Sequence, residues 1–196
     1  NVPAPYSVLA GMFGRRPQAE IDLMVTDKQL SVLENSEADI LYPSSIDSPP
    51  DRYLKISFSV RGHNQSNVIA RELYLSCTVT TDGGEYNKVR FLNYNQMDSI
   101  PGLEGQLNLI TRPELRVPPR SIVRFTNVEI ILSPYIESDF LLDGVIGADG
   151  TAPRNFRIYI PKNRLRSFVA RTMREDADPT LLLNEFFSEF LSGELE

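Results

Sequence analysis

The sequence is poor in the side chains on which most catalytic and metal sites depend. Its 196 residues include one cysteine, one histidine and no tryptophan. Cys77 can form no internal disulfide, and its place in the apolar run 73–79 predicts a buried structural thiol. The single His63 cannot build a histidine-rich metal site. We therefore predict no metal site and no cofactor. The lack of tryptophan also weakens a sugar-binding hypothesis, although tyrosine can supply a stacking surface.

Catalytic motifs are missing as well. No Gly-x-Ser-x-Gly elbow is present to orient a serine nucleophile beside His63. The chain has 26 acidic residues, but no pattern selects two of them as a general acid and base. The sequence therefore predicts no catalytic residues and no enzymatic activity. An enzyme with dispersed carboxylates stays as an alternative that no feature requires.

Composition excludes several other classes of protein. No apolar run approaches the roughly 18 residues needed to cross a bilayer, so no membrane span is predicted. The formal charge of −6 argues against a generic nucleic-acid-binding protein, which needs lysine and arginine gathered on one face. Residues 1–18 form a Pro/Gly-rich arm whose Arg15-Arg16 pair follows the short apolar stretch, the reverse of the order in a secretory leader. The sequence does not indicate a compartment.

Most of the chain between residues 19 and 161 has the two-residue period of β-strands. Alternation of apolar and polar side chains marks residues 19–27, 53–60 and 155–160, and a second run at 29–33 is expected to pair with the first. Residues 121–132 are apolar on both faces, which predicts a strand covered on both sides. Short strands without intervening helices predict a mainly β fold, an antiparallel β-sandwich of immunoglobulin-like or jelly-roll type.

Glycine and proline suggest where the strands end. Asp82-Gly83-Gly84 predicts a hairpin that joins 73–80 to 88–92 as antiparallel neighbours. Residues 93–105 are predicted as a connection with a short helical turn at 96–99.

Residues 143–153 are predicted as a Gly-rich loop. The side chains of Asp139, Asp143 and Asp149 frame this loop and offer oxygen ligands for Ca²⁺, although the intervening apolar residues do not fit an EF-hand. Asn64-Gln65-Ser66 matches the glycosylation pattern, which we interpret as a chance occurrence.

The period changes from strand to helix after residue 161. A first helix is predicted after Asn163 as its N-cap, and a second begins at Asp178-Pro179 and ends at Gly193. We therefore divide the chain into an arm (1–18), a β-sandwich domain (19–161) and a C-terminal pair of α-helices (162–196).

Charge is sorted sharply across these two helices. Residues 154–174 hold seven basic and no acidic side chains, whereas residues 175–196 hold seven acidic and no basic ones. The basic segment has three interpretations: a nucleic-acid or phosphate site, an ordinary solvated face, or an electrostatic partner for an acidic surface. The basic side chains assigned to partner binding are Arg164, Arg166, Arg171 and Arg174.

The last helix has an unusually wide apolar face, and its members are also assigned to partner binding. They are Leu181, Leu182, Leu183, Phe186, Phe187, Phe190 and Leu191. Burying seven such side chains would contribute on the order of 10 to 20 kcal/mol as an upper bound. An exposed ion pair contributes only about 0.2 to 1 kcal/mol. Packing therefore supplies the affinity of this helix for whatever it covers, which is either its own sandwich or a neighbouring subunit.

These features predict a non-catalytic structural module that mediates protein–protein assembly through its termini. The partner is a second copy of the chain or a different subunit, as in a virion or a secretion-type assembly. The alternative is an accessory β-sandwich domain that binds a ligand or Ca²⁺ through the loops at one end of the sandwich. No small-molecule ligand is evident from the sequence.

Overall fold

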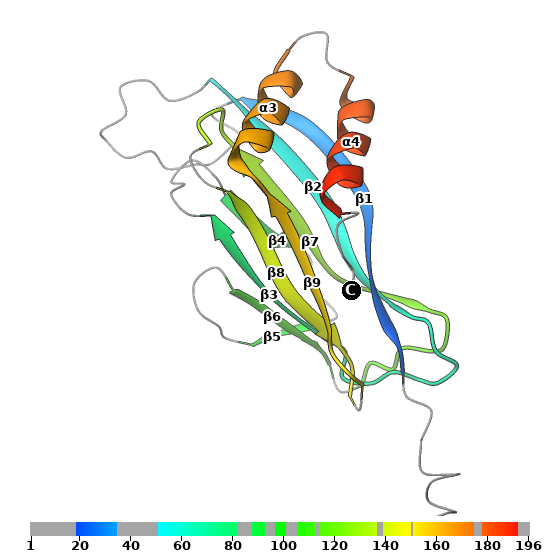
Figure 1. Ribbon diagram of the computed structural model, residues 1–196. Coiled ribbons are helices and arrows are strands. Elements are labelled where there is room, and N and C mark those ends of the chain that lie inside the picture. Colours follow the sequence, from blue (N-terminus) through cyan, green and yellow to red (C-terminus); the bar gives the residue numbers. More distant parts are fainter. Residues whose placement is uncertain are drawn as a thin grey trace, which may run out of the picture.

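Two antiparallel sheets and two C-terminal helices make up the described parts of the chain (Figure 1). The computed structural model describes residues 19–34, 51–81, 88–92, 97–100, 106–112, 114–136, 139–149, 151–174 and 178–191. The strands are β1 (Ile21–Glu34), β2 (Arg52–Asn64), β3 (Tyr74–Thr81), β4 (Lys88–Leu92), β5 (Met97–Ile100), β6 (Gln106–Thr111), β7 (Ile122–Leu132), β8 (Phe140–Gly147) and β9 (Arg154–Ile160), and the helices are α3 (Lys162–Thr172) and α4 (Pro179–Leu191). The strand orders are β1-β2-β7-β4 and β5-β6-β3-β8-β9. The predicted mainly β sandwich with a C-terminal helix pair is confirmed. The predicted arm, residues 1–18, lies outside the described residues.

The hydrophobic core fills the space between the two sheets. On β2, Leu54, Ile56 and Phe58 alternate with polar residues and are buried, as their two-residue period predicts. From the facing sheet, Leu75 and Leu142 join the same cluster. Each fully buried side chain of this size contributes about 1.5–3 kcal/mol relative to an exposed one. The inward rows of these strands are therefore committed to stability, and their outward rows are available for binding.

Strand β7 is covered on both faces at its C-terminal end, but the prediction fails at its start, where Ile122 is 48% exposed. Val128 and Ile130 point into the main core, while Ile131 is buried on the opposite face with Tyr53 and Leu33. This second, smaller cluster explains why the strand lacks a polar face at its C-terminal end.

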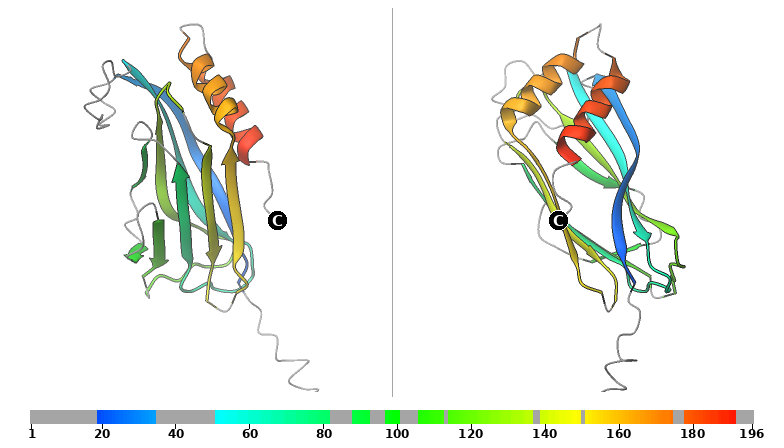
Figure 2. Two further views of the ribbon diagram at one scale, coloured as in Figure 1. Left: turned by 60° about the vertical axis from the view of Figure 1, so that its left-hand side comes forward. Right: turned by 45° about the vertical axis from the view of Figure 1, so that its right-hand side comes forward.

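The helix pair closes one open side of the sandwich (Figure 2). Helix α4 contacts both β1 and β9, which are edge strands of the two sheets. The ring of Phe187 meets Phe58 edge-on at 5.6 Å between centroids, and Lys28 Nζ lies 4.5 Å from the centroid of the same ring. Among the described residues, neither helix has the length and apolar character needed to cross a membrane.

Residues 29–33 are not a separate strand, and the prediction that they pair with 19–27 is wrong. Both segments belong to the single 14-residue strand β1, which pairs with β2 throughout. Its register shifts between Thr26 and Gln29, and Asp27 has a φ of 53°. The break in alternation is therefore a β-bulge rather than a turn.

The hairpin predicted at Asp82-Gly83-Gly84 does not join neighbouring strands. Strand β3 pairs with β6 and β8, whereas β4 pairs with β7 in the other sheet. The turn residues themselves, within 82–87, lie outside the described residues. Val89 and Phe91 pack against the core from the four-stranded sheet, so the chain crosses between layers here.

The helical turn predicted at 96–99 is also wrong, because Met97–Ile100 forms β5.

The predicted loop at 143–153 is in part a strand. Residues up to Gly147 belong to β8, which lies between β3 and β9. A methyl group on Gly144 would overlap the ring of Phe156 and the carbonyl oxygen of Ser76. One on Gly147 would overlap the ring of Tyr74. These glycines therefore permit close packing inside a sheet and do not mark a turn.

Candidate binding site

The apolar side chains predicted to bind a partner are largely used within the chain. Leu182, Phe186 and Phe187 are buried in the core of their own sandwich. Leu183 is half-buried against it, while Leu181 on the outer side of α4 is 66% exposed. The side chains of Phe190 and Leu191 lie outside the described residues. Binding of a partner by this face stays a prediction, and Leu181 is its most accessible member among the described side chains.

Two of the basic side chains of α3 make contacts within the chain. Arg171 donates to both carboxylate oxygens of Glu185 on α4, at 3.1 and 2.6 Å, so the two helices do meet through opposite charges. Arg166 Nε donates to the carbonyl oxygen of Ile136. Arg164 and Arg174 are exposed and form no ion pair with any described residue.

The two basic side chains of β9 pair with acids outside the helices. Arg154 donates to Glu20 and Asp22, which joins the start of β9 to the start of β1. Arg157 pairs with Asp143 on β8. Three of the seven basic side chains of residues 154–174 thus form ion pairs with described acids, and of these three only Arg171 pairs with an acid of residues 175–196.

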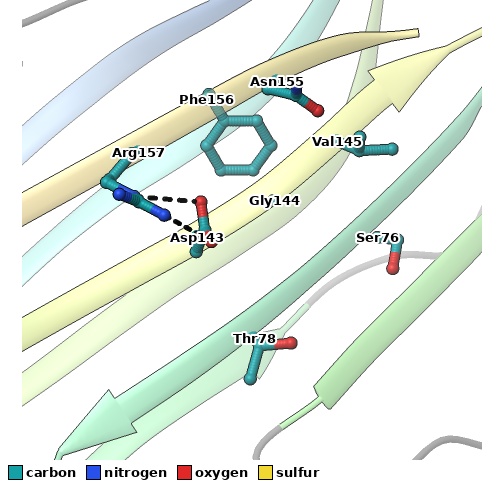
Figure 3. Close-up of a pocket in the computed structure, with 8 residues that line it drawn as sticks. All are labelled: Ser76, Thr78, Asp143, Gly144, Val145, Asn155, Phe156 and Arg157. Atoms are coloured by element: carbon teal, nitrogen blue, oxygen red, sulfur yellow. Dashed lines mark hydrogen bonds and ion pairs between the residues drawn. The ribbon is translucent and has the colours of Figure 1, made fainter.

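A shallow depression lies on the outer face of the five-stranded sheet (Figure 3). It has a volume of about 620 Å³ and takes its lining from three adjacent strands. The lining residues are Ser76, Thr78, Asp143, Gly144, Val145, Asn155, Phe156 and Arg157. Most of the side chains that face outward here are polar, which suits recognition by hydrogen bonds.

Strand register arranges these side chains in rows across the sheet. Thr78 lies opposite Asp143, and Asp143 lies opposite Arg157, which gives one row across β3, β8 and β9. In the next row, Ser76 lies opposite Val145 and Val145 opposite Asn155. Because inward and outward side chains alternate, Leu75 and Cys77 enter the core while Ser76 and Thr78 face out.

Asp143 and Arg157 form the charged part of the site. Arg157 donates through Nε and Nη2 to the two carboxylate oxygens of Asp143, at 3.4 and 3.2 Å. The hydrogen bonds that Arg157 donates to Asp143 raise the pKa of the guanidinium above its ordinary value, so the guanidinium stays positively charged. The row carries one positive and one negative charge, and the depression has no net charge of its own.

Tyr159 extends the outward row of β9 beyond Arg157. The residue is 51% exposed, and its hydroxyl donates to Asp139 Oδ2 at 2.7 Å. The other oxygen of Asp139 accepts the backbone N–H of Lys162 at 2.8 Å. The hydrogen bond from Lys162 is the main cause of the lowered pKa of Asp139, with that from Tyr159 second.

The same contacts correct the predicted cap of the first helix. Pro161 occupies the N-cap position and its side chain makes no capping bond, so Asn163 lies inside the helix rather than at its cap. Asp139, distant in sequence, accepts the N–H of the first helical residue instead. In contrast, Asp178 caps α4 as predicted, accepting from Thr180 and Leu181.

The three aspartates of the Ca²⁺ hypothesis do not form a common site. Asp139 and Asp149 flank the eight-residue strand β8, whose ends lie on the order of 25 Å apart at about 3.3 Å per residue. Asp143, within the strand, pairs with Arg157. Across the described ranges, no three side chains of histidine, cysteine, aspartate or glutamate lie together as metal ligands.

The candidate site also lacks an activated nucleophile among the described residues. Cys77 lies on the inner face of β3, and burial raises the pKa of its thiol to about 12. His63 belongs to β2 in the other sheet. The arrangement can therefore hold a polar ligand by hydrogen bonds and charge, on a surface fixed by strand pairing.

Sequence reasoning did not find this site. The alternation in 155–160 did place Arg157 and Tyr159 on a face away from the core. However, residues 143–153 were predicted as loop, so the facing strand that supplies Asp143 was missing. The signal that could have found it is the two-residue period of Phe140, Leu142 and Ile146, which Gly144 interrupts.

Comparison with known proteins gives no family for this chain. No protein-family model matches it, and no curated protein matches it. One similar solved structure is a Bordetella pertussis protein provisionally called ApaA, with a TM-score of 0.34 and 14% identity, covering 74% of this chain and 90% of that one. Another is AvmM, described as catalysing macrocyclization in alchivemycin A biosynthesis, with a TM-score of 0.31 and 10% identity at the same coverage. Likeness at this level carries no argument about function.

Proposed function

We propose that the protein is a non-catalytic binding module that holds a polar ligand on the outer face of its five-stranded sheet. The observation that carries the proposal is the depression lined by Ser76, Thr78, Asp143, Asn155 and Arg157. Three adjacent hydrogen-bonded strands fix the positions of these side chains, so little ordering is required when a ligand binds.

The packing of the helices favours the sheet face over the C-terminal helix as the main binding surface. Three of the seven apolar side chains on α4 are already buried against the sandwich. Exposing them to bind a partner would cost about 1.5–3 kcal/mol each. The sheet face needs no such rearrangement, because its outward side chains already face solvent.

A titration with small polar probes tests the proposal. The ¹⁵N-labelled full chain would be titrated separately with neutral sugars, amino acids, dicarboxylates and inorganic phosphate, and amide shifts followed by NMR. We expect at least one class to shift amides of β3, β8 and β9 together. If neither these classes nor a longer saccharide shifts amides on that face, the proposal is wrong.

Matched variants show whether a response comes from the site. The substitution Arg157→Ala removes one partner of the cross-strand pair with Asp143. Its control is Lys55→Ala, which removes one partner of the Lys55–Glu129 pair on the other sheet. The response should weaken in Arg157→Ala and stay unchanged in Lys55→Ala.

Assembly with a protein partner through the helices is a second candidate. It is favoured by the exposed Leu181 and by Arg164 and Arg174, which form no ion pair with a described acid. Light scattering of the full chain and of Leu181→Asp would test it. An oligomer that dissociates in the variant supports assembly, whereas a monomer at high concentration in both excludes self-assembly.

A further inference from the structure

The sheet-face depression offers hydrogen-bond donors and acceptors in nearly equal measure. Arg157 only donates and Asp143 only accepts, while the Asn155 amide and the Thr78 hydroxyl do both. Ser76 donates to Asn108 Oδ1 at 2.6 Å, which leaves its hydroxyl oxygen free to accept. A ligand that matches such a surface must itself donate and accept from neighbouring atoms.

The charge of the site favours a neutral ligand. Asp143 and Arg157 already neutralise each other across β8 and β9. An anion at the guanidinium would lie close to the Asp143 carboxylate, and it would approach a chain with a formal charge of −6. A cation at the carboxylate would likewise lie close to the Arg157 guanidinium. A neutral ligand leaves the pair in place.

Ligand hydroxyl groups fit this pair without breaking it. A hydroxyl can donate its proton to the Asp143 carboxylate and accept an N–H from Arg157 with the same oxygen. Both charged side chains are well exposed, at 45% and 65%, so their remaining donor and acceptor positions are accessible.

Tyr159 adds an aromatic surface beside these polar groups. It lies two residues after Arg157 on the same outward row of β9, about 7 Å along the strand at 3.3 Å per residue. The bond from its hydroxyl to Asp139 restrains the ring, while half of the side chain stays exposed. An exposed, restrained tyrosine ring can pack against the C–H face of a sugar ring, while its neighbours bind hydroxyls.

We propose that the outer face of the five-stranded sheet binds a neutral oligosaccharide, with one sugar ring on Tyr159 and the hydroxyls of the next ring on Arg157 and Asp143. This inference rests on the proposed function, because it names the ligand class of the same site. The spacing between Tyr159 and Arg157 requires a ligand longer than one ring. The shallow, open site predicts weak binding that strengthens with chain length.

Titration with neutral hexasaccharides of glucose, mannose, galactose and N-acetylglucosamine tests the assignment. Each would be added to the ¹⁵N-labelled full chain, with the matching monosaccharide as a length control. We expect at least one hexasaccharide to shift amides of β3, β8 and β9, and to bind more tightly than its monosaccharide. The assignment is overturned if no hexasaccharide binds this face.

Three variants separate the roles of the side chains. We expect Tyr159→Ala and Arg157→Ala each to weaken binding at least tenfold, and Tyr159→Phe, which keeps the ring, to weaken it less than Tyr159→Ala. Lys55→Ala on the other sheet should bind like the wild type. Both test residues are exposed, and circular dichroism would confirm that each variant is folded. Binding that survives both Tyr159→Ala and Arg157→Ala would overturn the assignment.

The outcome also separates this inference from the proposed function. If amino acids, dicarboxylates or phosphate shift the same amides while every saccharide fails, the binding module stands and the saccharide assignment is wrong. If no probe of any class shifts these amides, both are wrong.

Discussion

Substitution of Asn64 by alanine should remove a buried polar contact that holds two loops to the end of β2. The Asn64 side chain is 0% exposed. Its Nδ2 donates to the carbonyl oxygens of Val68, Val117 and Pro118 at 2.8, 3.0 and 3.1 Å. Its Oδ1 accepts from the backbone N–H and the hydroxyl of Ser66 at 3.2 and 2.7 Å. This burial also explains why the glycosylation pattern at 64–66 is unsuitable for modification in the folded chain.

The magnitude follows from these contacts. Two amide hydrogens and one amide oxygen form the equivalent of about three to four hydrogen bonds, each worth about 0.5–1.5 kcal/mol net. In the variant, the carbonyl oxygen of Val117 still accepts the N–H of Ala70, and that of Pro118 still accepts the hydroxyl of Ser121. These two carbonyl groups are therefore not left without donors. We therefore expect Asn64→Ala to lower the free energy of unfolding by about 3 kcal/mol. That loss corresponds to about 6–12 °C in Tm for a chain of this size.

Urea unfolding followed by far-UV circular dichroism is the suitable assay, because the chain has no tryptophan to report by fluorescence. The control is Asn67→Ala, an exposed asparagine whose amide oxygen accepts from Arg120. The control should change stability by about 0.5 kcal/mol or less. A loss below about 1 kcal/mol in Asn64→Ala, at unchanged m, would refute the reasoning.

Three further predictions concern the helices and the core. Phe187→Ala should lower the free energy of unfolding by about 3–5 kcal/mol, whereas Leu181→Ala should change it by about 0.5 kcal/mol or less. Equal effects of the two substitutions in urea unfolding would contradict the packing of α4. A double-mutant cycle on Arg171 and Glu185 should give a coupling free energy of at most about 1 kcal/mol, since both side chains are partly exposed. A much larger coupling would contradict this prediction. Cys77 should not react with Ellman's reagent near neutral pH until urea is added, because burial raises its pKa to about 12; rapid reaction of the native protein would show that the thiol is accessible.

The fold class was predictable because burial imposes a period on the sequence. Strand β2 shows this best: Leu54, Ile56 and Phe58 alternate with polar residues and are buried as predicted. Strand partners were not predictable in the same way. A turn signal such as Asp82-Gly83-Gly84 reports local backbone preference, but which sheet receives Val89 and Phe91 depends on packing across the whole sandwich.

The candidate site illustrates the same limit. Its central pair joins Asp143 to Arg157, 14 positions apart, and the contact exists only because β8 and β9 are adjacent strands in register. Gly144 suggested a loop, since glycine is common in turns. Gly144 instead lies within strand β8, where the ring of Phe156 occupies the space that a side chain would need. Local propensity and packing conflict there, and packing determines the structure.

The link between Tyr159 and α3 gives a pH-dependent prediction. Hydrogen bonds from the Lys162 N–H, and second from Tyr159, hold the pKa of Asp139 below its ordinary value. A carboxylate whose pKa is lowered in the folded state stabilises that state above the unfolded pKa, and this stabilisation is lost as the pH falls through the folded value. Asp139→Asn should therefore be less stable than the wild type at neutral pH, and the difference should shrink under acid conditions.

Thermal unfolding of both proteins across the pH range from about 7 to about 2 would measure that difference. The control is Asp149→Asn, which replaces an exposed aspartate whose side chain forms no ion pair with a described residue. Asp149→Asn should be about as stable as the wild type at neutral pH. Tyr159→Phe should show a smaller pH-dependent loss than Asp139→Asn, because the Lys162 N–H still caps the carboxylate. A wild-type advantage over Asp139→Asn that is constant from neutral to acid pH would mean that the ionised carboxylate does not stabilise the start of α3.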